Sequence, residues 1–544
     1  MTDHKTRLRL NQFTMPLDYK DKDIRSALMR RLDCNEKQIG EIRVVRRSLD
    51  ARAKGGAPVF VLSVELEWKS PSRPKRSLQH DIEFLESKDT AITPPPQMPN
   101  LSGKNRPVVV GAGPAGLMAA LWLAEAGLSP LLIERGGPTA DRTKQVKSFF
   151  KRGKLCPESN VLFGEGGAGL FSDGKLTNRS KDHIRGRQFL ETLVQCGAPR
   201  DILVEAEPHL GTDTLAQIIP ALRRRLQEAG GEVQFNSRLT GLHIENGVLR
   251  GVTVGEDTIE TESCVLATGH SARDVYELLS QSGVPLEAKP FAVGVRLELP
   301  QQHIDIAQWG QWACHPRLGA ATFRLTRHPV QDARACYSFC MCPGGSVIPC
   351  ASSKGALTSN GMSLAAREGK FGNAAFIVPV NPDDFPALPQ DGASALAGCR
   401  FQANIEQAAF IAGGSDYSLP ACLLTDFLHG QVSSQLPKEL SCPRSRPSDF
   451  RDILPDFVCD TLISALPPML QPLNGVRLED ALLYAAETRS SSPVRIIRNE
   501  ECQSPTAIGL FPAGEGSGHA GGIVSSAIDG LRAAEAVIRS YSRP

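Results

Sequence analysis

Two hydrophobic periods divide the first part of the chain into strands and a helix. Apolar and polar residues alternate over 8–10 and 59–66, and three of the four residues of 42–45 are apolar, so these three segments are predicted strands. Apolar residues at every fourth position over 23–32 predict a helix between the first two strands. This order predicts a small α+β domain of the ferredoxin-like type over residues 1–92.

A second pattern begins after a proline-rich segment, 93–106, which predicts a stiff linker. Three valines, 108–110, run directly into a glycine-rich turn. An alanine- and leucine-rich helix follows, and a second apolar strand covers 131–133 before Glu134. This strand, turn, helix and strand order is the one in which a G-x-G-x-x-G loop holds a dinucleotide.

The three glycines of this loop have separate predicted roles. Gly111 permits the tight turn, Gly113 lets the backbone approach a pyrophosphate, and Gly116 lets the helix pack closely on the sheet. The pyrophosphate would lie at the N-terminus of the helix that begins near Ala115, where free N–H groups favour an anion. Glu134 would accept hydrogen bonds from a ribose hydroxyl.

Regular patterns continue through the middle of the first half. Apolar positions along 212–229 fall on one helical face and predict an amphipathic helix. Segments 239–244, 248–254 and 258–262 then predict a short β-meander. Residues 264–269 predict a strand that returns beside the first valine strand and ends in a glycine turn at the cofactor.

His270 stands directly after that turn. A catalytic acid or base is one interpretation, and a hydrogen-bonded turn histidine is the other.

The C-terminal segment has a third strand, glycine turn and helix. A strand is predicted at 508–511 and a helix at 525–540, with Glu515 among the glycines between them. Such a turn offers a carboxylate to ribityl hydroxyls and N–H groups to a flavin.

A second G-x-G-x-x-G loop occurs at 164–169, but no helix pattern follows it. It is therefore predicted to be a glycine loop that lies against the flavin or its phosphates, and not a second dinucleotide fold. Lys175 and Arg179 either add positive charge there or are solvated loop cations.

Composition and charge limit the function classes. The 544 residues carry a formal net charge of +2, with 41% hydrophobic and 22% charged residues, which is ordinary for a globular protein. No secretory signal or membrane span is predicted, and the fourteen cysteines are expected to be reduced thiols in the cytoplasm. Residues 1–80 hold 18 Lys and Arg against 10 Asp and Glu. That basic surface fits either an RNA or protein partner, or a solvated or inter-domain face.

Four cysteines are spaced C-x3-C-x-C-x7-C, at Cys336, Cys340, Cys342 and Cys350. Cys-x-Cys spacing is cramped for two ligands of one zinc ion, and no metal is predicted. Cys340 and Cys342 on an extended strand would point the same way, but a bridge between them would be strained. The alternatives are a redox dithiol and two thiols packed beside the flavin, one of which tunes the flavin or donates a proton.

Arginines in a serine-rich loop near the end of the chain suggest an anionic ligand. Arg489, Arg495 and Arg498 suit a carboxylate or phosphate on the substrate or cofactor, although exposed loop arginines are common.

Eight sequence stretches carry a resemblance to known flavoproteins. The first loop with Glu134 and the segments ATG and GEGSGHAGG resemble the glutathione-reductase-type FAD enzymes. The stretches GEGGAGLFSDGKL, HLGTD, YSFCMCPGG, ETRSSSPVRI and GEGSGHAGG, with RSLDAR near the N-terminus, are similar to a bacterial family of uncharacterised FAD-dependent dehydrogenases. The sequence departs from that family at Leu170, Leu299 and His519. Where the family usually has a histidine, Leu299 stands, so a role for that histidine is in doubt.

The resemblance implies FAD and a redox role. The predicted fold is α/β: an FAD-binding Rossmann-type domain in two pieces (107–284 and 501–544), an inserted β-rich α+β substrate domain (285–500) and the N-terminal α+β domain. Candidate catalytic residues are Cys340, Cys342 and His270. The predicted cofactor-binding residues are Gly111, Gly113, Pro114, Ala115, Gly116, Glu134, Arg135, Gly166, Gly167, Ala168, Lys175, Val233, Thr268, Gly269, Gly514, Glu515, Gly521, Gly522 and Ile523.

The predicted function is an FAD-dependent oxidoreductase that transfers a hydride between a small organic substrate and the flavin N5, with an anionic substrate as one option. NAD(P)H would bind only transiently, as an electron donor at the substrate face. The alternatives are a flavin monooxygenase or oxidase, and a flavin-binding module whose N-terminal domain docks RNA or a protein.

Overall fold

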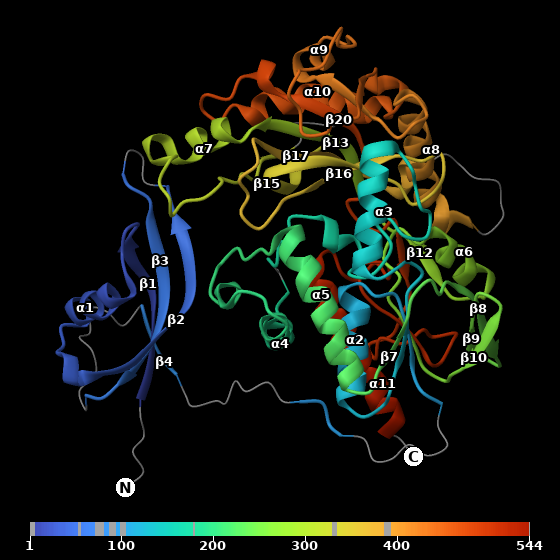
Figure 1. Ribbon diagram of the computed structural model, residues 1–544, viewed down its shortest axis with the longest axis horizontal. Coiled ribbons are helices and arrows are strands. Elements are labelled where there is room, and N and C mark those ends of the chain that lie inside the picture. The colour runs from blue at the N-terminus through green and yellow to red at the C-terminus, as the bar shows by residue number, and fades with distance from the viewer. Residues whose placement is uncertain are drawn as a thin grey trace.

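The computed structural model describes residues 6–52, 56–70, 81–85, 94–97, 105–177, 180–328, 334–385 and 393–542 (Figure 1). Most of the predicted linker lies outside these residues, as does Arg179. Among the helices of the described residues, none is both long and apolar enough to cross a membrane.

The N-terminal part is a four-stranded sheet with one helix on it. Its elements are β1 (Thr6–Pro16), α1 (Asp21–Leu32), β2 (Ile39–Asp50), β3 (Val59–Trp68) and β4 (Ile82–Leu85). The strand order β2-β3-β1-β4 is that of ferredoxin-like sandwiches. Ile24, Leu28 and Leu32 of α1 are buried, so the predicted helix and its apolar face are confirmed.

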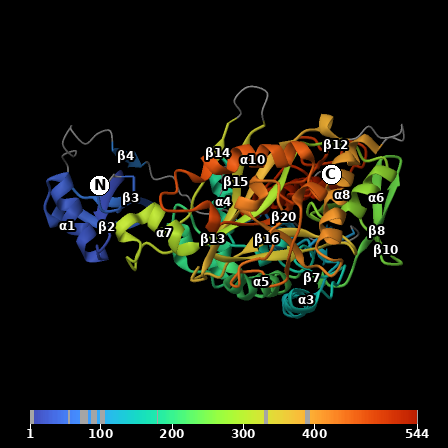
Figure 2. The same cartoon turned by 90° about the horizontal axis from the view of Figure 1, so that it is seen from above.

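This sheet stands at one end of the molecule, beside α7 (Gln301–Trp309) (Figures 1 and 2). Backbone hydrogen bonds join Arg47 of β2 to Val204 and Ala206, and the Arg47 side chain pairs with Glu205. Arg9 pairs within the sheet with Glu65. These ion pairs are consistent with the interpretation of the basic surface as a solvated or inter-domain face. The RNA or protein partner stays a prediction.

A parallel five-stranded sheet is formed from segments far apart in the sequence. Its order is β22-β11-β5-β6-β7, and the strands are β5 (Val108–Val110), β6 (Leu131–Ile133), β7 (Glu232–Gln234), β11 (Cys264–Leu266) and β22 (Leu510–Pro512). Strand β11 pairs with β5 in parallel, which confirms the predicted return of that strand. The C-terminal strand starts two residues later than predicted.

Helices α2 (Pro114–Glu125) and α11 (Ile523–Ser542) pack against each other beside this sheet (Figure 1). A Cβ on Gly530 would lie only 2.0 Å from the carbonyl oxygen of Ala115, so a glycine is needed where the two helices meet. The same part of the chain contains α3 (Thr139–Arg152), α4 (His183–Gln195), α5 (Gly211–Glu228) and α6 (Arg273–Gln281). The predicted meander is the three-stranded sheet of β8 (Leu239–Glu245), β9 (Val248–Val254) and β10 (Asp257–Glu260).

A large sheet, antiparallel except for the parallel pair β18 and β19, holds most of the segment from 291 to 487 and is called the large antiparallel sheet below. Its order is β14-β15-β17-β13-β20-β18-β19, with β16 paired to β15. The strands are β13 (Phe291–Pro300), β14 (Thr326–Arg327), β15 (Cys336–Cys350), β16 (Thr358–Met362), β17 (Phe371–Val380), β18 (Leu419–Leu423), β19 (Ser445–Pro447) and β20 (Leu482–Glu487). Around it lie α7, α8 (Ala397–Ala412), α9 (Leu424–Leu428) and α10 (Asp456–Leu470). A two-stranded sheet pairs β12 (Leu286–Ala288) with β21 (Val494–Ile496).

Candidate functional site

One cavity of about 1400 Å³ lies where the parallel sheet meets the large antiparallel sheet. Of the residues predicted for cofactor binding or catalysis, these line it: Gly111, Gly113, Pro114, Ala115, Glu134, Arg135, Gly167, Ala168, Lys175, Thr268, Gly269, His270, Cys340, Gly514, Glu515, Gly521, Gly522 and Ile523. Gly116, Gly166, Val233 and Cys342 do not line it. Residues from six separate segments of the sequence are therefore brought to one cavity.

The glycine loops of the cavity pack against one another through their backbones. Gly111 has a φ of +101°, and a Cβ there would lie 2.5 Å from the Ala267 carbonyl oxygen. A Cβ on Gly116 would lie 1.8 Å from the Gly111 carbonyl oxygen, which explains why this glycine packs behind the loop and not in the cavity. A Cβ on Gly516 would meet the carbonyl group of Gly269 at 2.6 Å. The loops therefore tolerate no side chain at these contacts.

Two helix N-termini open onto the cavity. Helix α2 follows Gly113, which has no side chain to cap the helix, and Pro114 occupies its first turn. Helix α11 begins at Ile523, directly after Gly521 and Gly522. The free N–H groups and dipole of a helix N-terminus suit an anionic group, so the pyrophosphate of FAD fits here. A cavity larger than the roughly 300–1,000 Å³ of drug-sized sites also leaves space for a second molecule.

Glu134 has a more structural position than the sequence predicts. Its carboxylate accepts hydrogen bonds from the backbone N–H groups of Ala112, Gly136 and Gly164, at 2.8, 2.8 and 3.0 Å. Because a carboxylate accepts about four hydrogen bonds, Glu134 can accept one more, from a ribose hydroxyl. The adjacent Arg135 lines the cavity and pairs with Glu158 and Asp274.

The loop at 164–169 is held from behind by charged side chains that the sequence analysis missed. Arg142 of α3 is fully buried and donates hydrogen bonds to the carbonyl oxygens of 160, 161, 164 and 165. Burial lowers the pKa of Arg142 to about 10, so it stays charged at neutral pH. Glu165 accepts from Thr139 and pairs with Arg223. The periodicity of α3 does not distinguish Arg142 from its exposed neighbours.

Two predicted cofactor residues are corrected here. Gly166 donates its N–H to the Ala112 carbonyl oxygen, and its open side faces Leu170 and Ile219, so it supports the loop from behind. Val233 lies in β7 at the edge of the parallel sheet and packs against the hydrophobic core. The loop at 164–169 is followed by a short 3₁₀ helix, Ala168–Phe171, as expected for a loop that is not a second dinucleotide fold.

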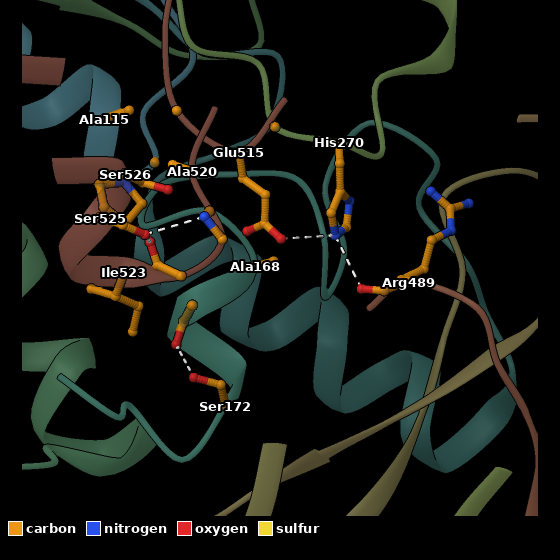
Figure 3. A pocket seen from close by; sticks show the side chains of 18 of the residues that line it. Ala115, Ala168, Ser172, His270, Arg489, Glu515, Ala520, Ile523, Ser525 and Ser526 are labelled. Atoms are coloured by element: carbon orange, nitrogen blue, oxygen red, sulfur yellow. Dashed lines mark hydrogen bonds and ion pairs between the residues drawn. The ribbon is translucent and has the colours of Figure 1, made fainter. Parts of the chain in front are cut away.

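Glu515 and His270 point toward each other across the cavity (Figure 3). The His270 Nε2 atom lies 3.8 Å from the Glu515 carboxylate and 3.1 Å from the Arg489 carbonyl oxygen. Burial and then the nearby Arg489 charge lower the pKa of His270 to about 4. At neutral pH the ring is therefore neutral, and its Nε2–H donates to the Arg489 carbonyl. This geometry makes His270 a turn residue that positions its neighbours.

The pKa of Glu515 is shifted in the opposite direction from that of His270. Burial raises the pKa of Glu515 to about 7. The positive charge of Lys289 opposes this shift, and the negative charge of Cys340 adds to it. A carboxyl group at this pKa can hold or release a proton near neutral pH. The sequence analysis predicted Glu515 as a ribityl partner and gave no indication of this proton.

The three arginines predicted as anion ligands already have carboxylate partners. Arg489 and Arg273 both pair with the buried Glu406, and the Arg489 guanidinium extends away from Glu515 and His270 (Figure 3). Burial would raise the pKa of Glu406, but the two arginines lower it to about 2. Arg498 pairs with buried Asp529, and Arg495 pairs with Glu287 at the surface. All three arginines therefore have carboxylate partners within the protein, and an anionic ligand at these residues stays a prediction.

The cysteine wall of the cavity is formed by β15, which is not a regular strand. Its pairing with β17 shifts between Phe339 and Cys342, and Cys340 has a φ of +43°. A left-handed backbone costs roughly 1–2 kcal/mol for a residue with a Cβ. The predicted strand is therefore observed, but it is bulged at Cys340 and not regularly extended there. The half-buried Cys340 lines the cavity, and Cys342 is fully buried behind it.

Lys175 lies on this wall. Its ammonium donates to the Met341 carbonyl oxygen and pairs with Asp173 at 2.8 Å. Asp173 is almost fully buried and also pairs with Arg367. Burial would raise the pKa of Asp173, but these two cations lower it. Lys175 lines the cavity, and Asp173 and the Met341 carbonyl oxygen hold its ammonium group, so its predicted contact with the flavin or its phosphates stays a prediction.

A second buried ion pair lies under the same cysteines. Arg296 of β13 forms two hydrogen bonds of 2.9 Å with Glu487 of β20. The same guanidinium donates to Asn373 and to the Cys340 carbonyl oxygen, at 2.9 and 3.3 Å. Leu299, where the similar family usually has a histidine, is buried in the core of this sheet, so that position does not face the cavity. Within the described residues, no three His, Cys, Asp or Glu side chains gather as a metal site.

Comparisons with known proteins agree with the cofactor fit. Residues 290–490 match the model of an FAD-dependent protein, C-terminal domain-like, residues 106–148 match an FAD binding domain, and residues 7–67 match a domain of unknown function. An uncharacterized protein of Clostridium beijerinckii is 41% identical over 541 residues, which are 99% of both chains. A probable fumarate reductase of Shewanella frigidimarina is 30% identical over 190 residues, 30% of this chain and 32% of that one.

Solved flavoprotein structures align only loosely. The flavin-dependent brominase Bmp2 gives a TM-score of 0.35 at 14% identity, covering 81% of this chain and 80% of that chain. This score is too low to indicate a shared fold. The near full-length match to the clostridial protein and the two FAD-related models show that this chain belongs to a family of FAD-dependent, oxidoreductase-type flavoproteins, with FAD as its cofactor.

Proposed function

We propose that this protein is an FAD-dependent dehydrogenase or reductase that transfers a hydride between a small organic substrate and the flavin. One observation carries the proposal: a single cavity is lined both by the glycine loops before α2 and α11 and by β15 and β20 of the antiparallel sheet. The first wall fits the cofactor, and the second belongs to the segment that matches the FAD-dependent C-terminal model. A substrate on β15 would thus share one cavity with the cofactor.

Bound FAD supplies the two-electron chemistry, with N5 as the atom that exchanges the hydride. The chain's own residues would bind, orient and protonate. The N–H groups at the start of α2 and α11 would bind the pyrophosphate. Glu515, with its pKa near 7, would hold a proton at its carboxyl group inside the cavity and give it to the substrate or take one from it. His270 would hold the backbone of Arg489 in place through its Nε2–H.

The electron donor is part of the proposal. The second glycine loop leads into a 3₁₀ helix, so it does not offer the helix N-terminus on which a second dinucleotide would rest. NAD(P)H would therefore bind transiently at the β15 wall and leave after transfer.

The experiment is a visible spectrum of the purified protein, followed by anaerobic addition of NADPH or NADH and then by air. We expect the absorption bands of oxidised flavin, bleaching by a nicotinamide and slow return in air. Rapid return in air would favour the oxidase or monooxygenase alternative. A protein that stays colourless after reconstitution with FAD would overturn the proposal.

A control variant tests the role of Glu515. Glu515→Gln keeps the shape of the side chain but cannot exchange a proton. We expect it to load with flavin and to lose the pH dependence of flavin reduction near pH 7. A variant with an unchanged pH profile would exclude Glu515 as the proton carrier.

A further inference from the structure

Two charged residues mark the mouth of the cavity. Glu207 and Arg324 both line the cavity, and their side chains are 61% and 67% exposed, so they lie where the cavity meets solvent. Glu207 precedes α5 on the side of the parallel sheet, and Arg324 precedes β14 of the large antiparallel sheet. Their side chains form an ion pair of 3.1 Å, which joins the two walls at the mouth. An exposed ion pair contributes little in water, so it does not fix the distance between the walls by itself.

The N-terminal domain contacts the first wall directly beside this mouth. Strand β2 lies at the edge of the N-terminal sheet, and segment 204–206 pairs with that edge. The Arg47 N–H donates to the Val204 carbonyl oxygen, and the Ala206 N–H donates to the Arg47 carbonyl oxygen, both at 2.8 Å. The Arg47 side chain also donates to Glu205 at 2.7 Å. Arg47, the first residue of the RSLDAR stretch, therefore holds the segment that ends at the mouth.

The same domain contacts the second wall through the loop at 312–318, which follows α7. Arg317 donates to the Tyr19 carbonyl oxygen at 2.6 Å, and its guanidinium lies over the Tyr19 and Phe60 rings, 4.6 and 4.9 Å from their centres. Two apolar side chains of this loop also pack against the hydrophobic core of the N-terminal domain, Trp312 and Leu318. The chain then lines the cavity at 322–324, so this contact holds the second wall.

The connection between the docked loop and Arg324 is firm. The Ala321 N–H donates to the Asp305 carboxylate at 2.7 Å, and the Ala321 carbonyl oxygen accepts from Gln301 at 3.1 Å. Asp305 and Gln301 belong to α7, which lies beside the N-terminal sheet (Figures 1 and 2). The loop and α7 therefore reach the mouth as one unit, and movement of the N-terminal domain would be passed on to it.

We propose that the N-terminal domain bridges the two walls of the cavity and, by fixing their spacing at the mouth, limits the size of the molecules that enter. Arg47 and Arg317 are the positioning residues of this bridge. A domain that served only to bind another partner would not need contacts with both walls beside the mouth. The inference goes beyond the proposed function, since access to the cavity can be measured without hydride transfer.

The experiment measures how fast two neutral maleimides alkylate Cys340 in the full-length, FAD-loaded protein. One reagent is the small N-ethylmaleimide and the other is the bulky N-pyrenylmaleimide. Cys340 lines the cavity and is half-buried, so it reports access through the mouth. Cys264 is fully buried in the parallel sheet and reports general opening of the protein. Mass spectrometry of the peptides gives the rate at each cysteine.

Three variants are compared with the wild type. Arg47→Ala and Arg317→Ala each remove one contact of the bridge. Arg9→Ala is the matched control, because Arg9 pairs with Glu65 within the N-terminal sheet and not with either wall. The loss of one exposed cation–π contact shifts a docking equilibrium by roughly two- to fivefold. We therefore expect Arg47→Ala and Arg317→Ala to speed alkylation of Cys340 by N-pyrenylmaleimide by about that factor, and by N-ethylmaleimide less.

The ratio of the two rates decides the test, because a change in the reactivity of the thiol itself would affect both reagents equally. Arg9→Ala should leave the ratio unchanged, and Cys264 should react equally slowly in every variant. The inference is overturned if the ratio stays the same in Arg317→Ala, or if Cys264 becomes as much faster as Cys340. Arg317 is itself exposed, so its replacement keeps the fold and decides the test even if Arg47→Ala unfolds.

Failure here is distinct from failure of the proposed function. A flavin that a nicotinamide reduces, in a protein whose ratio does not respond to Arg317→Ala, would reject only the bridge. A ratio that rises in a protein whose flavin accepts no hydride would reject only the oxidoreductase.

Discussion

The two walls of the cavity consist of different kinds of groups. The wall before α2 and α11 consists mainly of backbone: glycines in close contact, and helix N-termini that open onto the cavity. The wall at β15 consists of side-chain charges, with Asp173 between two cations and Arg296 paired to Glu487. Backbone geometry follows from local glycine spacing, whereas charge networks join residues up to about two hundred positions apart. The first wall can therefore be predicted from the sequence, and the second cannot.

The largest effect is expected behind the second wall, at Glu406. Glu406→Gln would leave Arg273 and Arg489 without a counter-charge, although all three side chains are largely buried. Removing one partner of a buried pair costs about 3–5 kcal/mol. Urea unfolding at pH 7 should show this loss, while Glu439→Gln, whose partner Lys370 is as exposed as Glu439 itself, should change stability by less than about 1 kcal/mol.

The same residue gives a pH prediction. The pKa of Glu406 is about 2 in the folded protein, below its unfolded value of about 4.3. Its contribution is therefore complete above the unfolded pKa and is lost as the pH falls from about 4.5 to about 2. Glu406→Gln should flatten this part of the acid stability curve. If the variant lost stability equally steeply as the pH falls, other carboxylates would be the cause.

Next in size are changes at the glycines of the first wall. A side chain at Gly116 would overlap the Gly111 carbonyl oxygen, so Gly116→Val should cost about 3 kcal/mol and abolish flavin loading. Gly113 is the matched control, because a Cβ there meets only the Gly167 Cα, at an ordinary 3.8 Å. Gly113→Ala should unfold like the wild type without flavin but retain less flavin. Full flavin loading of Gly113→Ala would contradict a close approach of the pyrophosphate at this residue.

These residues also show how far the sequence determines the site. The glycine spacing and valine strand predicted the turn at Gly111, the packing of Gly116 and the pairing of β11 with β5. The ion pair of Lys175 with Asp173 was not predicted, because Asp173 is also joined to Arg367, a residue 194 positions away. The strand at Cys340 was predicted as regular because no glycine or proline within 336–342 marks the extra residue of the bulge. Such features depend on the tertiary fold.

A smaller effect is expected from Glu515, which lies on the glycine wall but interacts with the charge of Cys340. Its folded pKa of about 7 exceeds the unfolded value of about 4.3. The ionised form therefore destabilises the fold increasingly as the pH rises from about 4.5 to about 7. Glu515→Gln should stabilise the flavin-free protein at pH 8 by about 2 kcal/mol, with no gain at pH 4. Thermal unfolding at both pH values measures this, and an equal gain at both would point to a packing effect.

The smallest effect should come from Arg495, which shares a serine-rich loop with Arg489 and has the same sequence-based interpretation. Its guanidinium pairs with Glu287 at the surface, both side chains are more than 40% exposed, and it does not line the cavity. An exposed pair contributes about 0–1 kcal/mol, so Arg495→Met should unfold almost as the wild type does and load flavin fully. Arg489→Met, by contrast, removes one of the two cations that hold Glu406 and should be clearly destabilised. If both variants lost the same free energy of unfolding, burial would not explain the difference expected between the two arginines. A slower flavin reduction in Arg495→Met alone would restore the anion-binding interpretation of this arginine, because an exposed residue that affects turnover without affecting stability must act on the ligand.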